Sequence, residues 1–263
     1  MIYLLIAILL VVIVDRSLPS LLQKLLYPAP AVAVTTPLEN LVEKVLATSN
    51  DNTISGWLQP PANDTTAMLL VLHGNGENLE TMKMGGILSS LSRLNIGYFA
   101  IDYPGYGNSS GTSSEENCVE AAITAYSWIR KEYPTNPLIV MGWSLGAGVT
   151  FQTVRQKNDV AGIIAISPWT RLADVAKEHY PEWVVNRWLK ESYDSVNSIN
   201  AIDCNLLLIH GENDGIIPFE HGRQLSQTGG DRVTWLPLRH TGHNNVFSQV
   251  ETWDAIRKFL AKL

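Results

Sequence analysis

The sequence G-W-S-L-G at residues 142–146 constrains the fold of this chain more than any other part of it. It follows the short apolar segment Leu138–Met141, which is typical of a buried strand, and it opens a segment with helical character that extends to about Gln156. A strand that turns into a helix through Gly-x-Ser-x-Gly presents the serine, here Ser144, at the edge of the sheet. A tight turn with an incidental serine is the alternative, and the strand–turn–helix context favours a nucleophile.

Segments with strand and helix character alternate from about residue 41 onward. The strand candidates are Ile54–Leu58, Ala67–His73, Gly97–Ile101, Leu138–Met141, Val160–Ile166, Leu206–His210 and Val233–Leu236. The helix candidates are Met82–Leu94, Val119–Tyr133, Ser144–Gln156, Phe219–Ser226 and Thr252–Ala261. This alternation predicts an α/β fold, with a mainly parallel sheet and helices on both of its faces.

Composition excludes several classes of protein. Apolar residues make up 46% of the 263 residues and charged residues 17%, a balance that excludes a disordered chain. Only one stretch is apolar enough to interact with a bilayer, which excludes a polytopic membrane protein. There are 19 Lys and Arg residues against 25 Asp and Glu residues, a net charge of −6 without a dominant basic patch, so we expect no nucleic-acid partner.

The two cysteines, Cys118 and Cys204, are too few for a disulfide framework or a zinc site. We expect each to be a small buried apolar residue. One disulfide between them is the alternative if the domain lies outside the cytoplasm.

The N-terminal residues predict a membrane anchor. Ile2–Val14 is an uncharged apolar run of thirteen residues, which as a helix is about 20 Å long, whereas a bilayer core is about 30 Å thick. Ser17–Tyr27 then places its leucines on one helical face. We predict an anchor and juxtamembrane helix over residues 1–27, with the side of the membrane left open. A cleaved signal peptide, or a helix packed on the domain or on a second copy in a homodimer, is the alternative.

The rest of the chain divides into a linker and a domain. Residues 28–40 are rich in Pro, Ala and Thr and predict a linker, followed by a single domain over residues 41–263. Within it, about residues 169–199 are rich in Trp and Tyr and are longer than a crossover requires. We predict that they form a small helical cap over the strand ends, with an ordinary crossover helix as the alternative.

A serine hydroxyl needs a base, and the base needs an acid to orient it. In a fold with this strand–turn–helix serine, the acid and then the histidine follow in the chain. His243 lies in a loop after the last strand and is the candidate base, with His240 as its rival. Asp214 follows the strand Leu206–His210 and is the candidate acid, with Glu212 as its rival.

The loop after the strand Ala67–His73 has a sequence suited to binding an oxyanion. It reads H-G-N-G-E-N over residues 73–78, and its glycines allow backbone N–H groups to approach a ligand. We expect the N–H groups of Asn75 and Leu145 to form the oxyanion hole. A phosphate-binding loop is the rival interpretation, but the spacing of those motifs is absent. For His73 and His210, which each end a strand before a glycine, structural hydrogen bonding is favoured over catalysis.

With these residues in place, about residues 45–263 resemble the α/β-hydrolase superfamily. The sequence D-Y-P-G-Y-G at residues 102–107, with Ser109 or Ser110, is similar to the family's D-Y-x-G-Y-G-x-S loop, and S-P-W at 167–169 resembles its strand end before the cap. The combination is similar to the membrane-anchored serine hydrolases of that superfamily, which include depalmitoylases, lysophospholipases and carboxylesterases. One position departs from the family's frequent G-H-N-D sequence, because Asn245 stands where Asp is common.

The resemblance implies hydrolysis of an ester or thioester without a metal or cofactor. Aromatic residues beside Ser144 and in the expected cap, among them Trp143, Trp169 and Trp183, are candidates to bind a medium or long acyl chain. Plain core packing is the alternative for these aromatics. The expected substrates are lipid-like esters such as lysophospholipids or monoacylglycerols. An acyl-protein thioesterase, a peptidase and an inactive membrane-tethered binding module remain alternatives.

Overall fold

A computed structural model describes residues 21–263 of the chain. The apolar run Ile2–Val14 and its predicted role as an anchor lie outside the described residues. Residues 21–26 form a short helical segment, which is the end of the predicted juxtamembrane helix. Among the described residues, no helix has the length and apolar character that crossing a bilayer requires.

One eight-stranded sheet organises the molecule, in the order β1-β2-β4-β3-β5-β6-β7-β8. Strand β2 pairs antiparallel with β1 and β4, and the remaining pairs are parallel. The strands are β1 (Val42–Ala47), β2 (Thr53–Gln59), β3 (Met68–Leu72), β4 (Gly97–Ile101), β5 (Leu138–Trp143), β6 (Gly162–Ile166), β7 (Asn205–Gly211) and β8 (Val233–Leu238). The predicted α/β class and mainly parallel sheet are confirmed.

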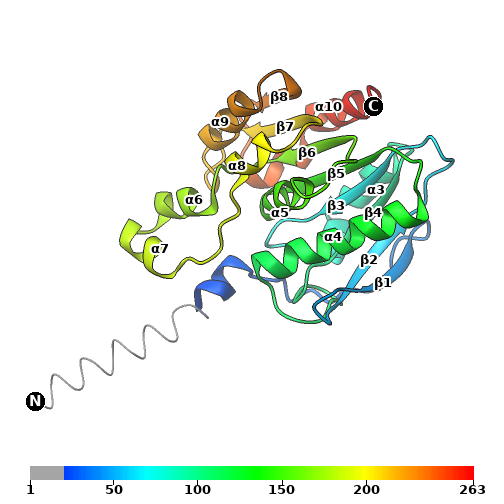
Figure 1. Cartoon of the computed structure of the whole chain (residues 1–263), viewed down its shortest axis with the longest axis horizontal. Coiled ribbons are helices and arrows are strands. Elements are labelled where there is room, and N and C mark those ends of the chain that lie inside the picture. Colours follow the sequence, from blue (N-terminus) through cyan, green and yellow to red (C-terminus); the bar gives the residue numbers. More distant parts are fainter. Residues whose placement is uncertain (1–20) are drawn as a thin grey trace, which may run out of the picture.

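Helices cover both faces of the sheet (Figure 1). One face packs against α4 (Glu115–Glu132), α5 (Leu145–Val154), α8 (Ser195–Asn200) and α9 (Phe219–Gly229). The other face packs against α2 (Leu79–Met84), α3 (Ile87–Ser92) and α10 (Val250–Leu260). Two short 3₁₀ helices, η1 (Gly230–Arg232) and η2 (His243–Ser248), flank β8.

The central strands are buried on both sides, which is why they read as continuous apolar runs. In β3 every residue is buried, with Leu70 and Leu72 in the core cluster under α4 and α5, and Leu69 and Val71 in the opposite one. Fully burying one such side chain contributes about 1.5–3 kcal/mol. The carboxyl ends of β3, β5, β7 and β8 thereby become fixed positions from which loops can present side chains.

The cap region lies between β6 and β7. It contains α6 (Leu172–His179) and α7 (Glu182–Trp188), and then α8 returns the chain to the sheet. In Figure 1, α6 and α7 project from the sheet at the end of the molecule where residues 21–26 lie. Residues 28–40, predicted as a linker, contain neither helix nor strand and lie along α2, where Thr35 donates hydrogen bonds from its N–H and hydroxyl to Glu80.

The structure differs from the sequence prediction in three local features. The predicted helix Met82–Leu94 is two helices, because Gly85 and Gly86 interrupt it and Gly86 takes a left-handed φ of 74°. Strand β1 was not predicted, since it is a largely exposed edge strand whose sequence, V-E-K-V-L-A, does not alternate apolar with polar residues. Cys118 is buried as expected, but Cys204 is only half-buried, and because both are free the alternative of a disulfide between them is wrong.

Candidate active site

Ser144 sits at the turn between β5 and α5, in a conformation that few residues adopt. Its φ of 55° and ψ of −114° lie outside the regions that L-residues favour, and its N–H donates to the carbonyl of Ile166 at 2.9 Å. The turn is tight enough to require both flanking glycines. A Cβ on Gly146 would lie 2.0 Å from the carbonyl oxygen of Leu72, and one on Gly142 would lie 2.0 Å from that of Gly146. Both glycines of the G-x-S-x-G sequence are therefore needed because other backbone segments approach them too closely for a side chain.

Asp214 and His243 meet at the neighbouring strand ends. His243 Nδ1 lies 2.7 Å from Asp214 Oδ2, and both side chains are almost completely buried. Because an ionised carboxylate only accepts hydrogen bonds, Nδ1 carries the hydrogen. In the neutral ring, Nε2 is then the basic nitrogen. The rival residues Glu212 and His240 are both exposed.

A second histidine, His210, also contacts the acid. Its Nε2 lies 3.3 Å from Asp214 Oδ2 and 2.9 Å from the carbonyl of Ile217, and two acceptors at one nitrogen place the hydrogen there. Burial alone would raise the pKa of the Asp214 carboxyl. The hydrogen bonds from His210 and His243, with a further one from the N–H of Ile217, outweigh burial and hold the pKa below its usual value. His210 was predicted to have a structural role, and its imidazole directly contacts the candidate acid, Asp214.

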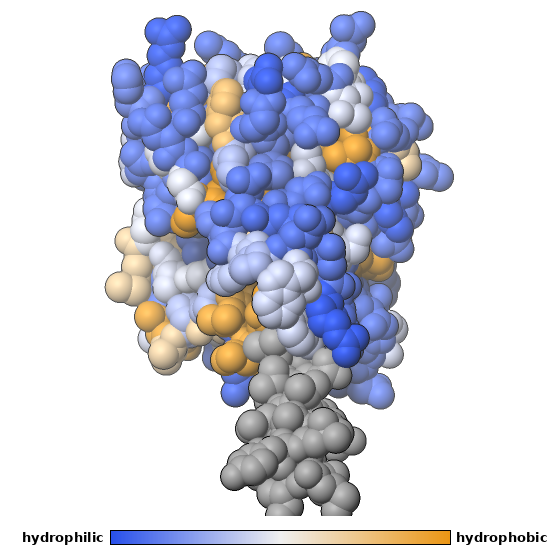
Figure 2. Space-filling model, turned by 90° about the vertical axis from the view of Figure 1, so that its left-hand side faces the viewer, coloured by the Kyte–Doolittle hydropathy of each residue, from blue (hydrophilic) through white to orange (hydrophobic). Residues whose placement is uncertain are grey.

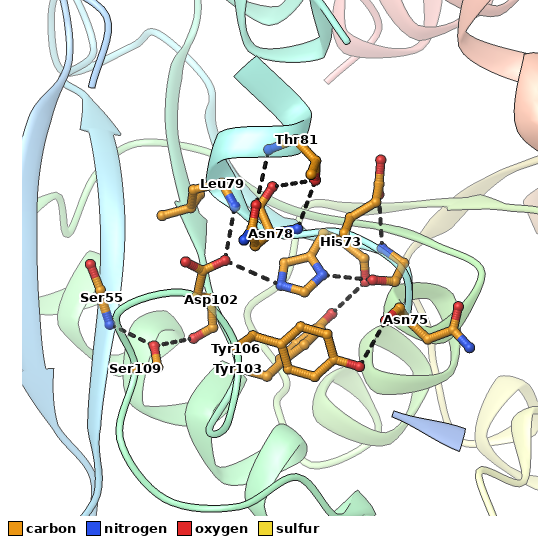
Figure 3. Close-up of polar contacts among 12 residues, drawn as sticks. Ser55, His73, Asn75, Asn78, Leu79, Thr81, Asp102, Tyr103, Tyr106 and Ser109 are labelled. Carbon is orange, nitrogen blue, oxygen red and sulfur yellow. Dashed lines mark hydrogen bonds and ion pairs between the residues drawn. The ribbon is translucent and has the colours of Figure 1, made fainter. Parts of the chain in front are cut away.

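The loop between β3 and α2 is held by two tyrosines (Figure 3). The Tyr103 hydroxyl donates to the carbonyl of His73 at 3.0 Å, and the Tyr106 hydroxyl donates to the carbonyl of Asn75 at 2.9 Å. The two rings also pack on the imidazole of His73, with centroids 4.4 and 5.1 Å away. These contacts fix the direction of the peptide units around Asn75.

Asp102 also holds the loop between β3 and α2. Its Oδ1 accepts the N–H of Leu79 at 2.9 Å and lies 3.5 Å from His73 Nε2, with both side chains fully buried (Figure 3). Gly107, at a φ of 49°, allows this arrangement because a Cβ there would lie 1.9 Å from Asp102 Oδ2. The D-Y-P-G-Y-G sequence is therefore a support for the candidate oxyanion loop.

A cavity of about 230 Å³ lies over Ser144. Its lining includes Asn75 and Leu145 as well as the serine, and Leu145 is the first residue of α5, where N–H groups have no partner within the helix. The other lining residues are Leu26, Trp169, Leu172, Val175, Ala176, His179, Tyr180, Ile216 and Ile217. In the described part of the chain, no cluster of three or more His, Cys, Asp or Glu side chains is arranged to hold a metal ion.

The three tryptophans predicted to bind substrate lie in different places. Trp169 lines the cavity, and its indole N–H donates to the carbonyl of Tyr193. Trp143 packs on the rings of His243 and Phe247 instead, with centroids 5.6 and 5.2 Å away. Trp183 is 67% exposed on α7.

Sequence reasoning missed several residues around the cavity. His179 of α6 pairs through Nε2 with the carbonyl of Ile216 at 2.8 Å, which joins the cap to the loop that carries Asp214. Leu26 also reaches the cavity from before the predicted domain, and no local motif marks either residue. The departure at Asn245 is accommodated, because its Oδ1 accepts the N–H of Gly242 at 2.7 Å in the loop before His243.

Comparison with known proteins is consistent with this geometry. Residues 63–198 match the family described as serine aminopeptidase S33 (Hydrolase_4), which is more than half of the chain. The chain is 28% identical to the lysophosphatidylserine lipase ABHD12 of Danio rerio over 207 residues, or 69% of this chain and 54% of that protein. It spans between 54% and 58% of the lengths of the lysophosphatidylserine lipases it matches.

Solved structures share the fold. An esterase of Pyrococcus furiosus superposes with a TM-score of 0.73 at 18% identity, over 89% of this chain and 97% of that one. The alpha/beta hydrolase GrgF from Penicillium sp. superposes with a TM-score of 0.69 at 16% identity, over 84% and 98%. At such identities the likeness concerns the fold alone. The chain belongs to the serine aminopeptidase S33 family, within the α/β-hydrolase superfamily.

Proposed function

We propose that this chain is a serine hydrolase that cleaves carboxylic esters, with Ser144 as nucleophile, His243 as base and Asp214 as the acid that orients it. The observation that carries the proposal is the hydrogen-bonded, buried Asp214–His243 pair, whose imidazole packs on Trp143, the residue before Ser144 at the cavity. Asn75 and Leu145 line the same cavity, and we assign their N–H groups to the oxyanion hole.

The proposed reaction has two acyl-transfer steps. Ser144 Oγ bonds to the acyl carbon while His243 Nε2 takes the hydroxyl proton, and the tetrahedral intermediate has its oxyanion at the N–H donors. The ester C–O bond then breaks, and the alcohol leaves with the proton from His243. Water attacks the acyl-enzyme, gives its proton to His243, and the carboxylic acid leaves as Ser144 regains a proton.

An ester fits the cavity better than a peptide, although the family's description names an aminopeptidase. An aminopeptidase must bind the charged amino terminus of its substrate, for which a carboxylate is the usual partner. Within residues 21–263 the cavity lining contains no Asp or Glu, and most of it is aliphatic or aromatic. This favours an acyl chain without charge, as in a lysophospholipid or a monoacylglycerol. An acyl-protein thioester presents the same acyl chain and is the second candidate substrate.

Hydrolysis of p-nitrophenyl esters from acetyl to palmitoyl tests the proposal. We expect the wild type to turn them over, and Ser144→Ala to lower kcat at least about a thousandfold while it remains folded. Labelling of the wild type, but not Ser144→Ala, by a fluorophosphonate probe would identify the serine. Full turnover by Ser144→Ala, or faster cleavage of aminoacyl p-nitroanilides than of any ester, would refute the proposal.

We also propose that residues 1–27 hold the protein at a membrane, with the apolar run Ile2–Val14 as the inserted part. Co-sedimentation of the full chain with phosphatidylcholine vesicles measures this association. A charge in the run, Leu9→Asp, is expected to reduce the bound fraction severalfold, because a buried carboxylate is costly in hydrocarbon. The matched control is Val250→Asp at an exposed position of α10, and equal loss with both variants would count against the anchor.

A further inference from the structure

A second cavity adjoins the one over Ser144. Four residues line both cavities, namely Leu26, Leu172, Ala176 and Tyr180, so the two spaces meet at a shared wall. The second cavity, which we call the cap groove, is lined in addition by Leu22, Leu25, Val184, Val185 and Leu189. An acyl chain that passes from Ser144 between these four residues would reach the cap groove.

The chemistry of the cap groove is that of a hydrocarbon site. Of its nine lining residues, Tyr180 alone carries a polar side-chain atom. Residues 21–26 supply one wall, and α6, α7 and the following Leu189 supply the other. Figure 1 shows residues 21–26, α6 and α7 at the same end of the molecule. A polar ligand gains little binding free energy from such a surface, whereas an apolar ligand gains free energy for each methylene group that binding removes from water.

Residues 21–27 are held on the rest of the domain by three polar contacts. The Tyr27 hydroxyl pairs with the Tyr193 hydroxyl at 3.0 Å, and the Gln23 side chain donates to the carbonyl of Ser113 at 2.6 Å. The Asn75 side chain donates to the carbonyl of Leu26 at 3.3 Å. The wall of the groove is thus tied both to the segment after the cap helices and to a residue of the candidate oxyanion loop.

The outer end of the cap groove reaches exposed apolar surface. Leu25, which lines the groove but not the cavity over Ser144, is 56% exposed, and Leu21 and Trp183, next in sequence to the groove residues Leu22 and Val184, are also exposed. Figure 2 shows apolar residues gathered at this end of the molecule, where the described chain begins. The apolar run Ile2–Val14 precedes the same wall in the sequence. An apolar surface in this position indicates a hydrophobic, lipid-like occupant.

We infer that the cap groove binds the fatty acyl chain of the substrate, and that the juxtamembrane residues 21–26 form one wall of this subsite. The inference rests on the proposed function and specifies its substrate class, an ester whose acyl chain is longer than the cavity over Ser144 can hold. Each methylene group buried in the groove contributes a factor of up to about four in kcat/KM. We therefore expect kcat/KM to rise with acyl chain length, starting from butyryl, until the chain fills the groove.

Variants on each wall of the groove test the inference in the full chain. Leu22→Trp and Val184→Trp each fill the groove, and each has a matched control on the same segment that points to solvent, Lys24→Trp and Asn186→Trp. We expect the ratio of kcat/KM for p-nitrophenyl palmitate over butyrate to fall at least tenfold in both groove variants. The controls should keep the wild-type ratio, and thermal unfolding checks that all four variants are folded.

A binding measurement separates this inference from the proposed function. A fluorescent long-chain fatty acid is titrated into the Ser144→Ala protein, where catalysis plays no part, and both groove variants are expected to weaken its binding about tenfold. Wild-type palmitate selectivity and wild-type probe binding in Leu22→Trp and Val184→Trp would overturn the inference while ester turnover still stands. Normal probe binding without turnover of any ester would refute the proposed function alone. A dimer that Leu22→Trp dissociates, with probe binding unchanged, would assign the groove to a second copy.

Discussion

Asp214 accepts hydrogen bonds through both carboxylate oxygens. Oδ1 accepts the N–H groups of Ile216 and Ile217 at 2.9 and 2.8 Å, and Oδ2 faces His210 and His243. Four donors around one buried carboxylate stabilise its charged form, which is why the pKa of this carboxyl is lowered although burial alone would raise it. The carboxylate is therefore a fixed negative charge against which the candidate base is oriented.

The lowered pKa of Asp214 makes a prediction about stability and pH. A carboxyl whose pKa is lower in the folded than in the unfolded chain stabilises the fold above its unfolded value, about 3.9, and this contribution is lost as the pH falls below it. In Asp214→Asn the amide NH2 group faces N–H donors in either orientation of the side chain, and we expect the substitution to lower the free energy of unfolding by about 1–3 kcal/mol at pH 7. Urea unfolding of both proteins at pH 7 and pH 3 measures the difference.

Other carboxylates also titrate in acid, so the informative quantity is the difference between wild type and Asp214→Asn at each pH. This difference should shrink at pH 3. Glu212→Gln, at the exposed rival position, is the control and should change stability little at either pH. A difference that stays constant between the two pH values would show that the carboxylate is not held in its charged form.

At the scale of elements, the loop between β3 and α2 depends on the Tyr106 hydroxyl that donates to the carbonyl of Asn75. Tyr106→Phe frees that peptide unit, so we expect kcat for a short ester to fall about five- to tenfold with little change in KM, since a whole oxyanion donor is worth about a hundredfold or more. The cost in stability should be near 1 kcal/mol. Steady-state kinetics and urea unfolding measure the two effects.

Tyr126 provides a matched control for this change. Its hydroxyl is buried in α4 and finds no hydrogen-bond partner within residues 21–263. Tyr126→Phe should therefore leave kcat unchanged and stability unchanged or raised. Equal kinetic losses in both variants, or an increase of KM alone in Tyr106→Phe, would argue against a positioning role for Tyr106.

The sequence predicted the elements that have local signals. The strand–turn–helix around Ser144 is marked by an apolar run, two glycines and a helical pattern. The loop with Asp214 follows the buried strand β7, and the loop with His243 follows the last strand, β8. By contrast, the edge strand β1 reads V-E-K-V-L-A, which does not alternate apolar with polar residues, so no strand periodicity marks it. The contacts of His210 and Leu26 with the site could not be predicted, because they depend on how distant segments pack, which no local pattern encodes.

At the scale of the whole molecule, the Tyr27–Tyr193 hydrogen bond joins residues 166 positions apart. Burial raises the pKa of both phenols, so both stay protonated and one hydroxyl can donate to the other. A double-mutant cycle of Tyr27→Phe and Tyr193→Phe, measured by urea unfolding, should give a coupling energy of about 0.5–1.5 kcal/mol. Additive effects of the two substitutions would show that the pair does not hold the N-terminal segment on the domain.

The long sequence separation within this pair also has a consequence for how the protein is made. Residues 21–27 leave the ribosome roughly 10 to 30 seconds before Tyr193 does, at about 5–20 residues per second. During that interval Leu26 and Tyr27 lack the core residues on which they later pack, and such surfaces are recognised by chaperones or aggregate. The earliest part of the described chain to be synthesised is therefore among the last to reach its native contacts.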